Sequence, residues 1–389
     1  KRQMILTEEM IQYIENHRQE AYNLLLELAR IPAPSNHEER RAEFCSDWLK
    51  AQGARGVYVD QALNVVYPAD VRQDGPVEVF MAHMDVVFPD ETELPLRVED
   101  GRICCPGAGD DTACLVCLLL AGKYIAEHVD TPGWREIRGG DAPGLLLVCN
   151  AGEEGLGNLK GVRNICRDYG DRMESFCTFD STLSSIVDRA VGSRRFRIRV
   201  RTRGGHSYND FGNENAIAGL ASLVVKLYGI RLPEGGKTTY NAGTISGGTS
   251  VNTIAQEAEM LYEFRSDRKE NLEYMEQRFQ EAVDQAKAEG LDVSVEVMGV
   301  RPCEGEVDRE RKQALTDRAH RVVAEITGQE PEHCAGSTDC NIPLSMGIPS
   351  VCVGSFRGAG AHTREEYVEI DSLEEGYKVA FGMMFGKRD

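Results

Sequence analysis

Apolar residues in the first part of the chain follow two patterns, one with helical spacing and one of short runs that are apolar almost throughout. The helical spacing, introduced in one case by Thr7 and the acidic Glu8 and Glu9, predicts helices at residues 7–29, 38–52 and 112–127. The short runs predict strands at residues 57–59, 65–67, 77–82 and 145–150. The last two runs are typical of strands that helices bury on both faces. Helices alternating with such strands predict an α/β sandwich around a mixed sheet.

The middle of the chain, residues 190–299, has a different pattern. From Arg195 to Arg201 arginine alternates strictly with apolar residues, which is typical of a half-buried strand. Helices at residues 215–228 and 271–289, and further strands at 240–245, 259–265 and 291–298, give the order βαββαβ. That order is the order of a ferredoxin-like α+β module with one open sheet face. We expect the arginines to pair with acidic neighbours such as Glu259 and Glu263 rather than with a polyanion.

The earlier pattern resumes after Pro302, with a predicted helix at residues 311–327 and a strand at 350–353. A chain of 389 residues is too long for one ordinary core, so two domains are expected. The prediction is an α/β fold with a mixed-sheet αβα domain, residues 1–189 and 301–389. The ferredoxin-like α+β domain, residues 190–300, is inserted into it.

Composition and charge exclude several classes of partner. The net charge of −19 argues against binding to nucleic acid or to an anionic membrane. The longest apolar stretch, residues 113–121, is far short of the ~20 residues that span a bilayer. The twelve cysteines lie mostly in apolar runs, and the Cys114-x-x-Cys117 motif has no second pair at zinc-site spacing, so buried reduced thiols are expected. Reduced thiols and the absence of a signal-peptide pattern predict a cytoplasmic protein, although the missing initiator Met leaves a trimmed leader open.

Acidic and imidazole side chains stand where the predicted elements end. Each is unremarkable alone, but carboxyl ends of strands gather at one edge of an α/β sheet, so these positions could converge. The set, given in chain order with its place, is His83 and Asp85 after the strand at 77–82, Asp110 and Asp111 before the buried helix, Glu153 and Glu154 after the strand at 145–150, Asp180 after residues 176–179, and His362 beyond the glycine-rich segment 354–360.

Five of these side chains suit two metal ions. His83 and Asp180 would bind one ion, Glu154 and His362 would bind the other, and Asp110 would bridge them. Mixed imidazole and carboxylate ligands favour zinc, with cobalt or manganese as alternatives, over calcium. Two such ions could hold a hydroxide and polarise a carbonyl group.

Two further side chains would then support the reaction. Glu153 is left over from the ligand set and can act as the general base, taking a proton from the water and passing it to the leaving amine. Asp85 would hydrogen-bond the far nitrogen of His83 and fix its tautomer.

Four segments resemble the M20 metallopeptidase family, namely H-M-D-V-V, P-G-A-G-D-D, N-A-G-E-E-G-L-G-N-L-K-G and G-A-G-A-H. The resemblance covers nearly the whole chain. It implies a zinc-peptidase catalytic domain with two Zn²⁺ ions and the ligand roles given above, and the choice of Asp110 over Asp111 as the bridging ligand rests on this resemblance alone. It also implies that the inserted module is a lid and dimerisation domain, and that the protein is a homodimer.

The resemblance also implies roles for five residues outside the metal set. His206 in Gly-Gly-His-Ser resembles the lid histidine that reaches the partner subunit's site and stabilises an oxyanion. Arg265 and Asn252 resemble the pair that holds a substrate carboxylate and carbonyl, for which the planar guanidinium is well suited. Gly336 and Ser337 open a loop, Gly-Ser-Thr-Asp, that looks like a substrate-contacting loop.

One position departs from the family pattern, because Thr112 stands where many members have Lys. This departure weakens assignment to the deacetylase branch, and the Asp110–Asp111 doublet occurs in the peptidase T-like branch. We therefore expect hydrolysis of a di- or tripeptide beside a free carboxylate. An N-acyl-amino-acid deacylase remains the alternative. A non-catalytic relative that binds peptide or metal is a third reading, against which the presence of Glu153 argues.

Overall fold

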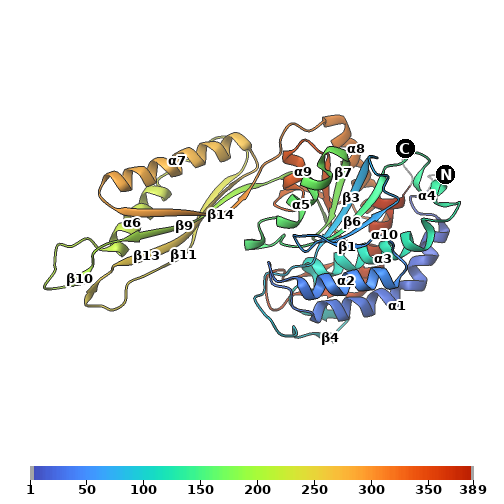
Figure 1. Cartoon of the computed structure of the whole chain (residues 1–389), viewed down its shortest axis with the longest axis horizontal. Coiled ribbons are helices and arrows are strands. Elements are labelled where there is room, and N and C mark those ends of the chain that lie inside the picture. Colours follow the sequence, from blue (N-terminus) through green and yellow to red (C-terminus); the bar gives the residue numbers. More distant parts are fainter. Residues whose placement is uncertain (1–3, 387–389) are drawn as a thin grey trace. The chain divides into compact units, whose positions relative to one another are not determined.

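The protein is described by a computed structural model over residues 4–386, and it divides into two compact units (Figure 1). Unit 1 contains the chain up to Arg189 and again from Glu306 on. Unit 2 is Ala190–Gly305. The chain therefore leaves unit 1 once, forms unit 2 and returns.

Unit 1 is built on an eight-stranded sheet in the order β1-β2-β6-β3-β7-β16-β8-β15. Its strands are β1 (Tyr58–Val59), β2 (Val65–Ala69), β3 (Val77–His83), β6 (Gly144–Asn150), β7 (Met173–Phe179), β8 (Ser185–Ala190), β15 (Glu332–Gly336) and β16 (Ser350–Val353). The central pairs β6–β3, β3–β7 and β7–β16 are parallel, whereas β1–β2, β2–β6 and β16–β8 are antiparallel. Every residue of β3, β6 and β16 is buried. The mixed sheet with buried central strands confirms the predicted α/β class.

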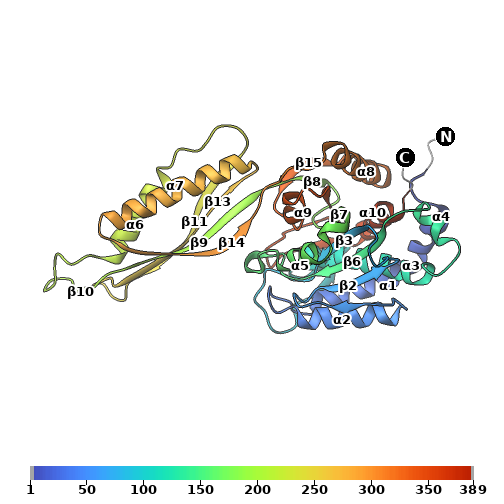
Figure 2. The ribbon, with the colours of Figure 1, turned by 45° about the horizontal axis from the view of Figure 1, so that its top comes forward.

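Helices cover both faces of this sheet. The helices of unit 1 are α1 (Glu8–Arg30), α2 (Glu39–Ala51), α3 (Cys114–His128), α4 (Trp134–Arg138), α5 (Lys160–Tyr169), α8 (Arg309–Thr327), α9 (Asn341–Ser345) and α10 (Leu373–Phe385). Crossovers β3–α3–β6 and β6–α5–β7 run in opposite directions along the sheet, so their right-handedness places α3 and α5 on opposite faces. Figure 2, like Figure 1, shows β3 and β6 between α2 and α9.

Four helices of unit 1, namely α4, α5, α9 and α10, were not predicted, and α3 begins later than predicted. The helix predicted from residue 112 begins instead at Cys114, because Ala108–Ala113 form a π-helical turn with non-helical backbone angles at Asp110 and Asp111. Helix α10, one of the helices that were not predicted, is buried along most of its length. It packs against α1, α3 and α8, and Gly376 allows it to approach the backbone oxygen of Ser355, which a Cβ would meet at 1.8 Å.

A small four-stranded sheet of unit 1 was not predicted either. Its order is β17-β18-β5-β4, with β4 (Arg97–Glu99), β5 (Arg102–Cys104), β17 (Gly358–Ala359) and β18 (Tyr367–Glu369). Strands of two or three residues carry too little periodicity to be recognised. This sheet joins the segment that precedes Asp110 to the hairpin that carries His362.

Unit 2 has the predicted ferredoxin-like fold. Its elements are β9 (Gly192–Arg201), α6 (Ala216–Tyr228), β11 (Thr238–Gly247), β13 (Glu257–Ser266), α7 (Lys269–Ala288) and β14 (Asp292–Arg301). The sheet order is β11-β13-β9-β14, with all neighbours antiparallel. Two-residue strands β10 (Gly205–His206) and β12 (Thr253–Ile254) form a separate antiparallel pair.

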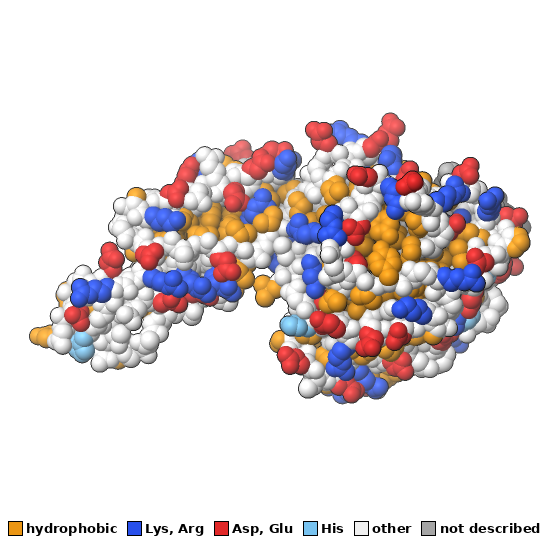
Figure 3. All heavy atoms as spheres, in the orientation of Figure 1, with side chains coloured by type: hydrophobic (Ala, Val, Ile, Leu, Met, Phe, Trp, Pro, Cys, Tyr) orange, Lys and Arg blue, Asp and Glu red, His pale blue; other side chains and the backbone are white. Residues whose placement is uncertain are grey.

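The alternating arginines of β9 pair with glutamates on the neighbouring strand β13, as predicted. Arg195 Nε lies 3.2 Å from Glu263 Oε2, and Arg199 Nε lies 2.5 Å from Glu259 Oε2. Figure 3 shows the basic and acidic side chains side by side over these strands. Because the arginines are already neutralised, this face is a solvated face rather than a polyanion site.

Two further expectations concern thiols and membranes. All twelve cysteines are unpaired, and ten of them are buried, which confirms the expectation of buried thiols. Among residues 4–386, no helix combines the length and the apolar character needed to cross a bilayer.

The core of unit 2 should depend strongly on Phe279. Its ring is 2% exposed and stacks on Phe196 at a centroid distance of 4.2 Å. Replacing Phe279 with Ala should lower the free energy of unfolding of unit 2 by about 3–5 kcal/mol, because removal of the ring leaves a cavity. Urea denaturation measures this change. Phe211→Ala is the control, since that ring is 89% exposed and its loss should change stability by less than about 0.5 kcal/mol. Equal effects of the two substitutions would contradict this assignment of the core.

Candidate metal centre

The parallel strands of unit 1 end at one edge of the sheet, and the candidate ligands gather there. β3 ends at His83, β6 ends at Asn150, and Asp180 follows the last residue of β7. Three groups of side chains each place their ligand atoms within 4.8 Å of one another. They are His83 with Asp111 and Asp180, His83 with Glu153 and Glu154, and Asp110 with Glu154 and His362. The structure thus brings all five predicted ligands to one place, and Asp111 with them.

Asp110 lies between the two histidines. Its Oδ1 is 3.2 Å from His83 Nε2, and its Oδ2 is 3.0 Å from His362 Nε2. His362 Nε2 is also 3.2 Å from Glu154 Oε1. One carboxylate therefore faces an imidazole with each of its oxygens, which is the arrangement needed to bridge two ions. The geometry favours Asp110 over Asp111 for this position.

Two oxygen atoms of Asp85, one from the backbone and one from the carboxylate, face Nδ1 of His83. The closest partner of His83 Nδ1 is the backbone carbonyl oxygen of Asp85 at 2.9 Å, whereas the carboxylate oxygen Oδ1 is 3.4 Å away. A proton on Nδ1 leaves the lone pair of Nε2 directed at the cluster. Nε2 is buried and makes no hydrogen bond within residues 4–386, so a metal ion would satisfy it.

The Asp85 carboxylate also holds the next segment. It accepts hydrogen bonds from the backbone N–H groups of Glu153 and Glu154, both at 3.0 Å, and from Ser35 Oγ at 2.7 Å. The same carboxylate therefore faces both the His83 ring and the segment that carries the two glutamates. Asp85 therefore positions the two glutamates relative to His83, a role that sequence spacing did not indicate.

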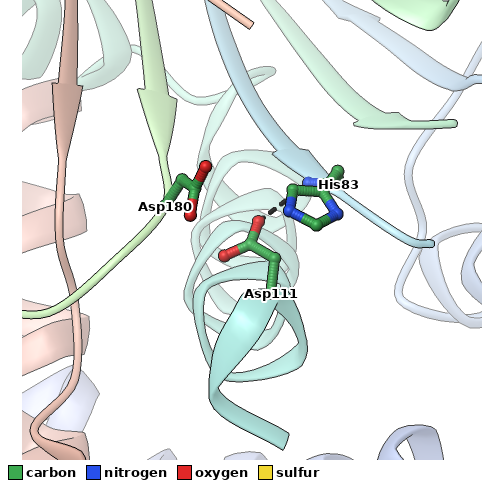
Figure 4. A group of neighbouring side chains, drawn as sticks. All are labelled: His83, Asp111 and Asp180. Atoms are coloured by element: carbon green, nitrogen blue, oxygen red, sulfur yellow. Dashed lines mark hydrogen bonds between the residues drawn. The ribbon is translucent and has the colours of Figure 1, made fainter. Parts of the chain in front are cut away.

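Asp111 lies beside the backbone of His83, and its side chain points toward Asp180 (Figure 4). Its Oδ2 accepts a hydrogen bond from the His83 backbone N–H at 2.8 Å. Its Oδ1 is buried without a hydrogen-bond partner in the described part of the chain. Burial, followed by the neighbouring charges, raises the pKa of both Asp111 and Asp180 well above the ordinary range.

The electrostatics of the cluster fit a divalent cation. Burial raises the pKa of Glu154 to about 7, and repulsion from Asp110 and Glu153 adds to the rise. Hydrogen bonds to Asp110 and Glu154 raise the pKa of His362 to about 11. The cluster combines mutually repelling carboxylates, the orphaned Nε2 of His83 and a protonated imidazole. A metal ion would relieve all three, because it replaces the proton and supplies positive charge.

The predicted substrate loop lies at the same edge. Gly336 ends β15, Ser337 follows, and Asn150 Nδ2, at the end of β6, donates to Asp339 Oδ2 at 2.8 Å. Burial, together with the nearby Glu153, raises the pKa of Asp339 to about 8. Asn150 and Asp339 are side chains that sequence analysis did not place in the site, although both fall within motifs that it singled out.

The remaining predicted residues lie in unit 2. His206 is in β10, and the backbone N–H of Ser207 donates to Asn252 O at 2.9 Å, so His206 and Asn252 are neighbours. Arg265 lies near the far end of β13, roughly 25 Å along the strand from Glu257, and it is paired with Glu263 at 2.8 Å. Within unit 2, Arg265 and Asn252 are therefore not brought together.

Comparisons with known proteins agree with this geometry. The family model described as peptidase family M20/M25/M40 matches residues 79–385. A succinyl-diaminopimelate desuccinylase of Nitrosomonas eutropha is 26% identical over 322 residues, covering 77% of this chain and 80% of that protein. A tripeptidase from Staphylococcus aureus superposes with a TM-score of 0.74 at 22% identity, covering 94% of this chain and 97% of the other. The Bacillus subtilis YxeP protein, a dinuclear metal-binding peptidase of family M20, gives a TM-score of 0.62 at 17% identity, covering 95% of this chain and 98% of the other.

Metal uptake should release protons at neutral pH. The raised pKa of His362 keeps its ring protonated at pH 7 in the metal-free protein, whereas a metal ligand must be neutral, so the metal displaces that proton and its affinity rises with pH. Calorimetric titration of chelator-stripped protein with zinc, in two buffers of different ionisation enthalpy, counts the protons. His362→Asn should release about one proton fewer than the wild type. Identical proton release from the two proteins would contradict this account.

Proposed function

Because this chain belongs to peptidase family M20/M25/M40, we propose that it is a two-zinc hydrolase that cleaves a di- or tripeptide beside the free carboxylate. The observation that carries the proposal is the position of Asp110, which lies between His83 and His362 with Glu154 alongside. Acidic side chains without a metal would not require an imidazole beside each oxygen of one carboxylate. A two-metal hydrolase requires this arrangement, because the carboxylate is shared and each ion needs further ligands.

The chain offers a complete set of ligands for two ions. His83 and Asp180 would hold one, Glu154 and His362 would hold the other, and Asp110 would be shared. Nitrogen and carboxylate ligands in this proportion favour zinc, with cobalt or manganese as substitutes. When bound, such ions supply Lewis-acid activation of a water molecule and of the scissile carbonyl.

Glu153 is the proposed general base. Its backbone N–H is held by Asp85 Oδ1 at 3.0 Å, so its position relative to His83 is fixed by the same residue that orients the imidazole. Its side chain is almost entirely buried, which limits competition from bulk water. In this position the carboxylate takes a proton from the attacking water and returns it to the leaving amine.

His206 is proposed to donate a hydrogen bond to the oxyanion. Its Nδ1 accepts hydrogen bonds from the backbone N–H groups of Tyr208 at 3.2 Å and Asn209 at 3.3 Å. The ring proton is therefore on Nε2, where it is available as a donor. Asn252, its neighbour, would bind the substrate carbonyl beside it.

Arg265 is the proposed partner of the substrate carboxylate, which would compete with Glu263 for its guanidinium. Gly336 and Ser337 would contact the substrate from the loop that Asn150 and Asp339 attach to the sheet edge. Each of these assignments concerns substrate binding rather than the chemical step.

Unit 2 also offers a surface for a homodimer. Strand β11 is the edge of its sheet and is mostly exposed. The adjacent helix α6 exposes apolar side chains, among them Val225 at 73% and Tyr228 at 46%. An unpaired edge strand beside an exposed apolar helix face is the kind of surface that a second copy covers. We propose that His206 and Asn252 act in the site of the partner subunit.

The substrate class is the point at which relatives differ, since they include both a tripeptidase and a desuccinylase. We favour a peptide substrate because the Asp110–Asp111 doublet resembles the peptidase T-like branch of the family. An N-acyl-amino-acid deacylase with the same metal ligands is the alternative. A non-catalytic relative that binds peptide or metal is a third candidate. The twelve unpaired thiols support a reducing compartment, and we place the protein in the cytoplasm.

Substrate class can be decided with a panel of di- and tripeptides tested against N-acetyl-, N-succinyl- and N-benzoyl-amino acids. Zinc-loaded protein should hydrolyse peptides, and a chelator should abolish the activity. Glu153→Gln should lower kcat by about 10²–10⁴-fold with its zinc content unchanged, because it removes the base alone. Glu154→Gln is the contrasting variant and should lose zinc as well as activity. Hydrolysis of the acylated amino acids alone would transfer the protein to the deacylase class, and full activity of Glu153→Gln would refute the base.

Action in trans can be tested by subunit mixing. Homodimers of Glu153→Gln and of His206→Asn should both be nearly inactive. In a mixed dimer, the subunit with an intact Glu153 receives an intact His206 from its partner, so one of two sites works. Random pairing should therefore restore about a quarter of the wild-type activity. Sedimentation as a monomer, or no recovery on mixing, would contradict the dimeric site.

A further inference from the structure

We infer that Glu366 is a positioning residue for the metal centre, because its carboxylate holds the turn that carries Asp110 in register with His362. The inference deepens the proposed function and rests on it. Glu366 is 1% exposed and lies outside the set of ligands and catalytic groups described above. Nothing in the spacing of the sequence marks it.

The carboxylate of Glu366 is surrounded by backbone donors of the Asp110 turn. Its Oε2 accepts from the N–H of Gly107 at 2.6 Å, and its Oε1 accepts from the N–H groups of Gly109 at 3.0 Å and Asp110 at 2.8 Å. Among residues 4–386, these backbone groups are its hydrogen-bond partners, and no lysine or arginine forms an ion pair with it. A buried charge held by three N–H groups of one turn fixes the conformation of that turn.

Glycine is needed where the turn meets this carboxylate. A Cβ on Gly109 would lie 2.6 Å from the ring of Phe356 and 3.0 Å from Glu366 Oε1. Gly107 has φ +75°, in the left-handed region, and a Cβ there would lie 2.4 Å from Val86 Cγ1. The turn is therefore packed between the strand end that leads from His83 and the segment that carries Glu366.

Glu366 also belongs to the same hairpin as His362. It directly precedes β18, which pairs with β17 on one side and β5 on the other, and its carbonyl oxygen accepts from the N–H of Cys105 at 3.1 Å. His362 lies in the connection between β17 and β18. One short segment thus supplies a metal ligand and the acceptor for the turn that carries the other ligand. This closed set of contacts sets the 3.0 Å separation of His362 Nε2 and Asp110 Oδ2.

Substituting Gln for Glu366 tests the role with little change in shape. A side-chain amide has one acceptor oxygen, and its NH₂ group would face a backbone N–H that needs an acceptor. Zinc affinity of the chelator-stripped protein, measured by calorimetric titration, should fall by about 10–100-fold, because the shared ligand and His362 lose their common register. Cobalt absorption spectra, which report ligand geometry, should change in parallel.

A second variant and two matched controls separate positioning from general destabilisation. Gly109→Ala keeps the carboxylate but displaces it, and should weaken zinc binding in the same direction; it also carries the test if Glu366→Gln does not fold. Glu78→Gln alters another buried carboxylate, bonded to Arg138 at 2.9 Å at the opposite end of β3, and Gly133→Ala adds a methyl group in open space. Both controls should bind zinc within about twofold of the wild type.

The outcomes distinguish the two levels of the argument. Wild-type zinc affinity in both Glu366→Gln and Gly109→Ala would overturn the positioning role while leaving the proposed function intact. An equal loss in Glu78→Gln would also overturn it, since the effect would then follow from lowered stability. Failure of the wild-type protein to bind zinc would refute the proposed function itself.

Discussion

Repulsion among carboxylates at the end of a buried sheet is the constraint around which unit 1 is organised. Asp110, Asp111, Glu153, Glu154 and Asp180 converge there, and burial together with neighbouring carboxylates raises the cost of charging Asp111, Glu154 and Asp180. The protein offsets this cost in two ways. It places His83 and His362 against the shared Asp110, and it commits Asp85 and Glu366 to backbone N–H groups of the segments that carry the other ligands. Positive charge from a metal completes the balance.

The surrounding fold supplies rigidity rather than chemistry. The fully buried strands β3 and β6 end side by side, so His83 and Asn150 are in register across the ladder. The small sheet of β4, β5, β17 and β18 attaches the His362 hairpin to the chain just before the Asp110 turn. Ligands that are far apart in the sequence thereby depend on short and well-packed connections, which is the condition for a site held to a fraction of an ångström.

Sequence reasoning selected the candidate ligands that the structure brings together because they end strongly apolar segments, a signal that is local in the chain. The same reasoning identified β9 and its glutamate partners from strict alternation. It did not identify Glu366, the Asn150–Asp339 contact or the hydrogen bonds from Glu153 and Glu154 to Asp85, because each joins groups that are distant in sequence. Helix α10 was missed although α3, which is also apolar on nearly every side, was recognised, so the lack of an amphipathic period does not account for the difference.

The way unit 2 joins the rest of the chain has a consequence for how such proteins change. Its first and last strands, β9 and β14, are neighbours, with Ser193 opposite Arg301, so the chain enters and leaves at points about 5 Å apart. An insertion with closely spaced ends requires little change in the domain that contains it, because a short turn could close the same gap. The residues proposed to recognise substrate, Arg265 and Asn252, can therefore be exchanged as a block without disturbing a single metal ligand. Modular connection of this kind allows one hydrolytic centre to acquire new substrates by replacement of its inserted unit.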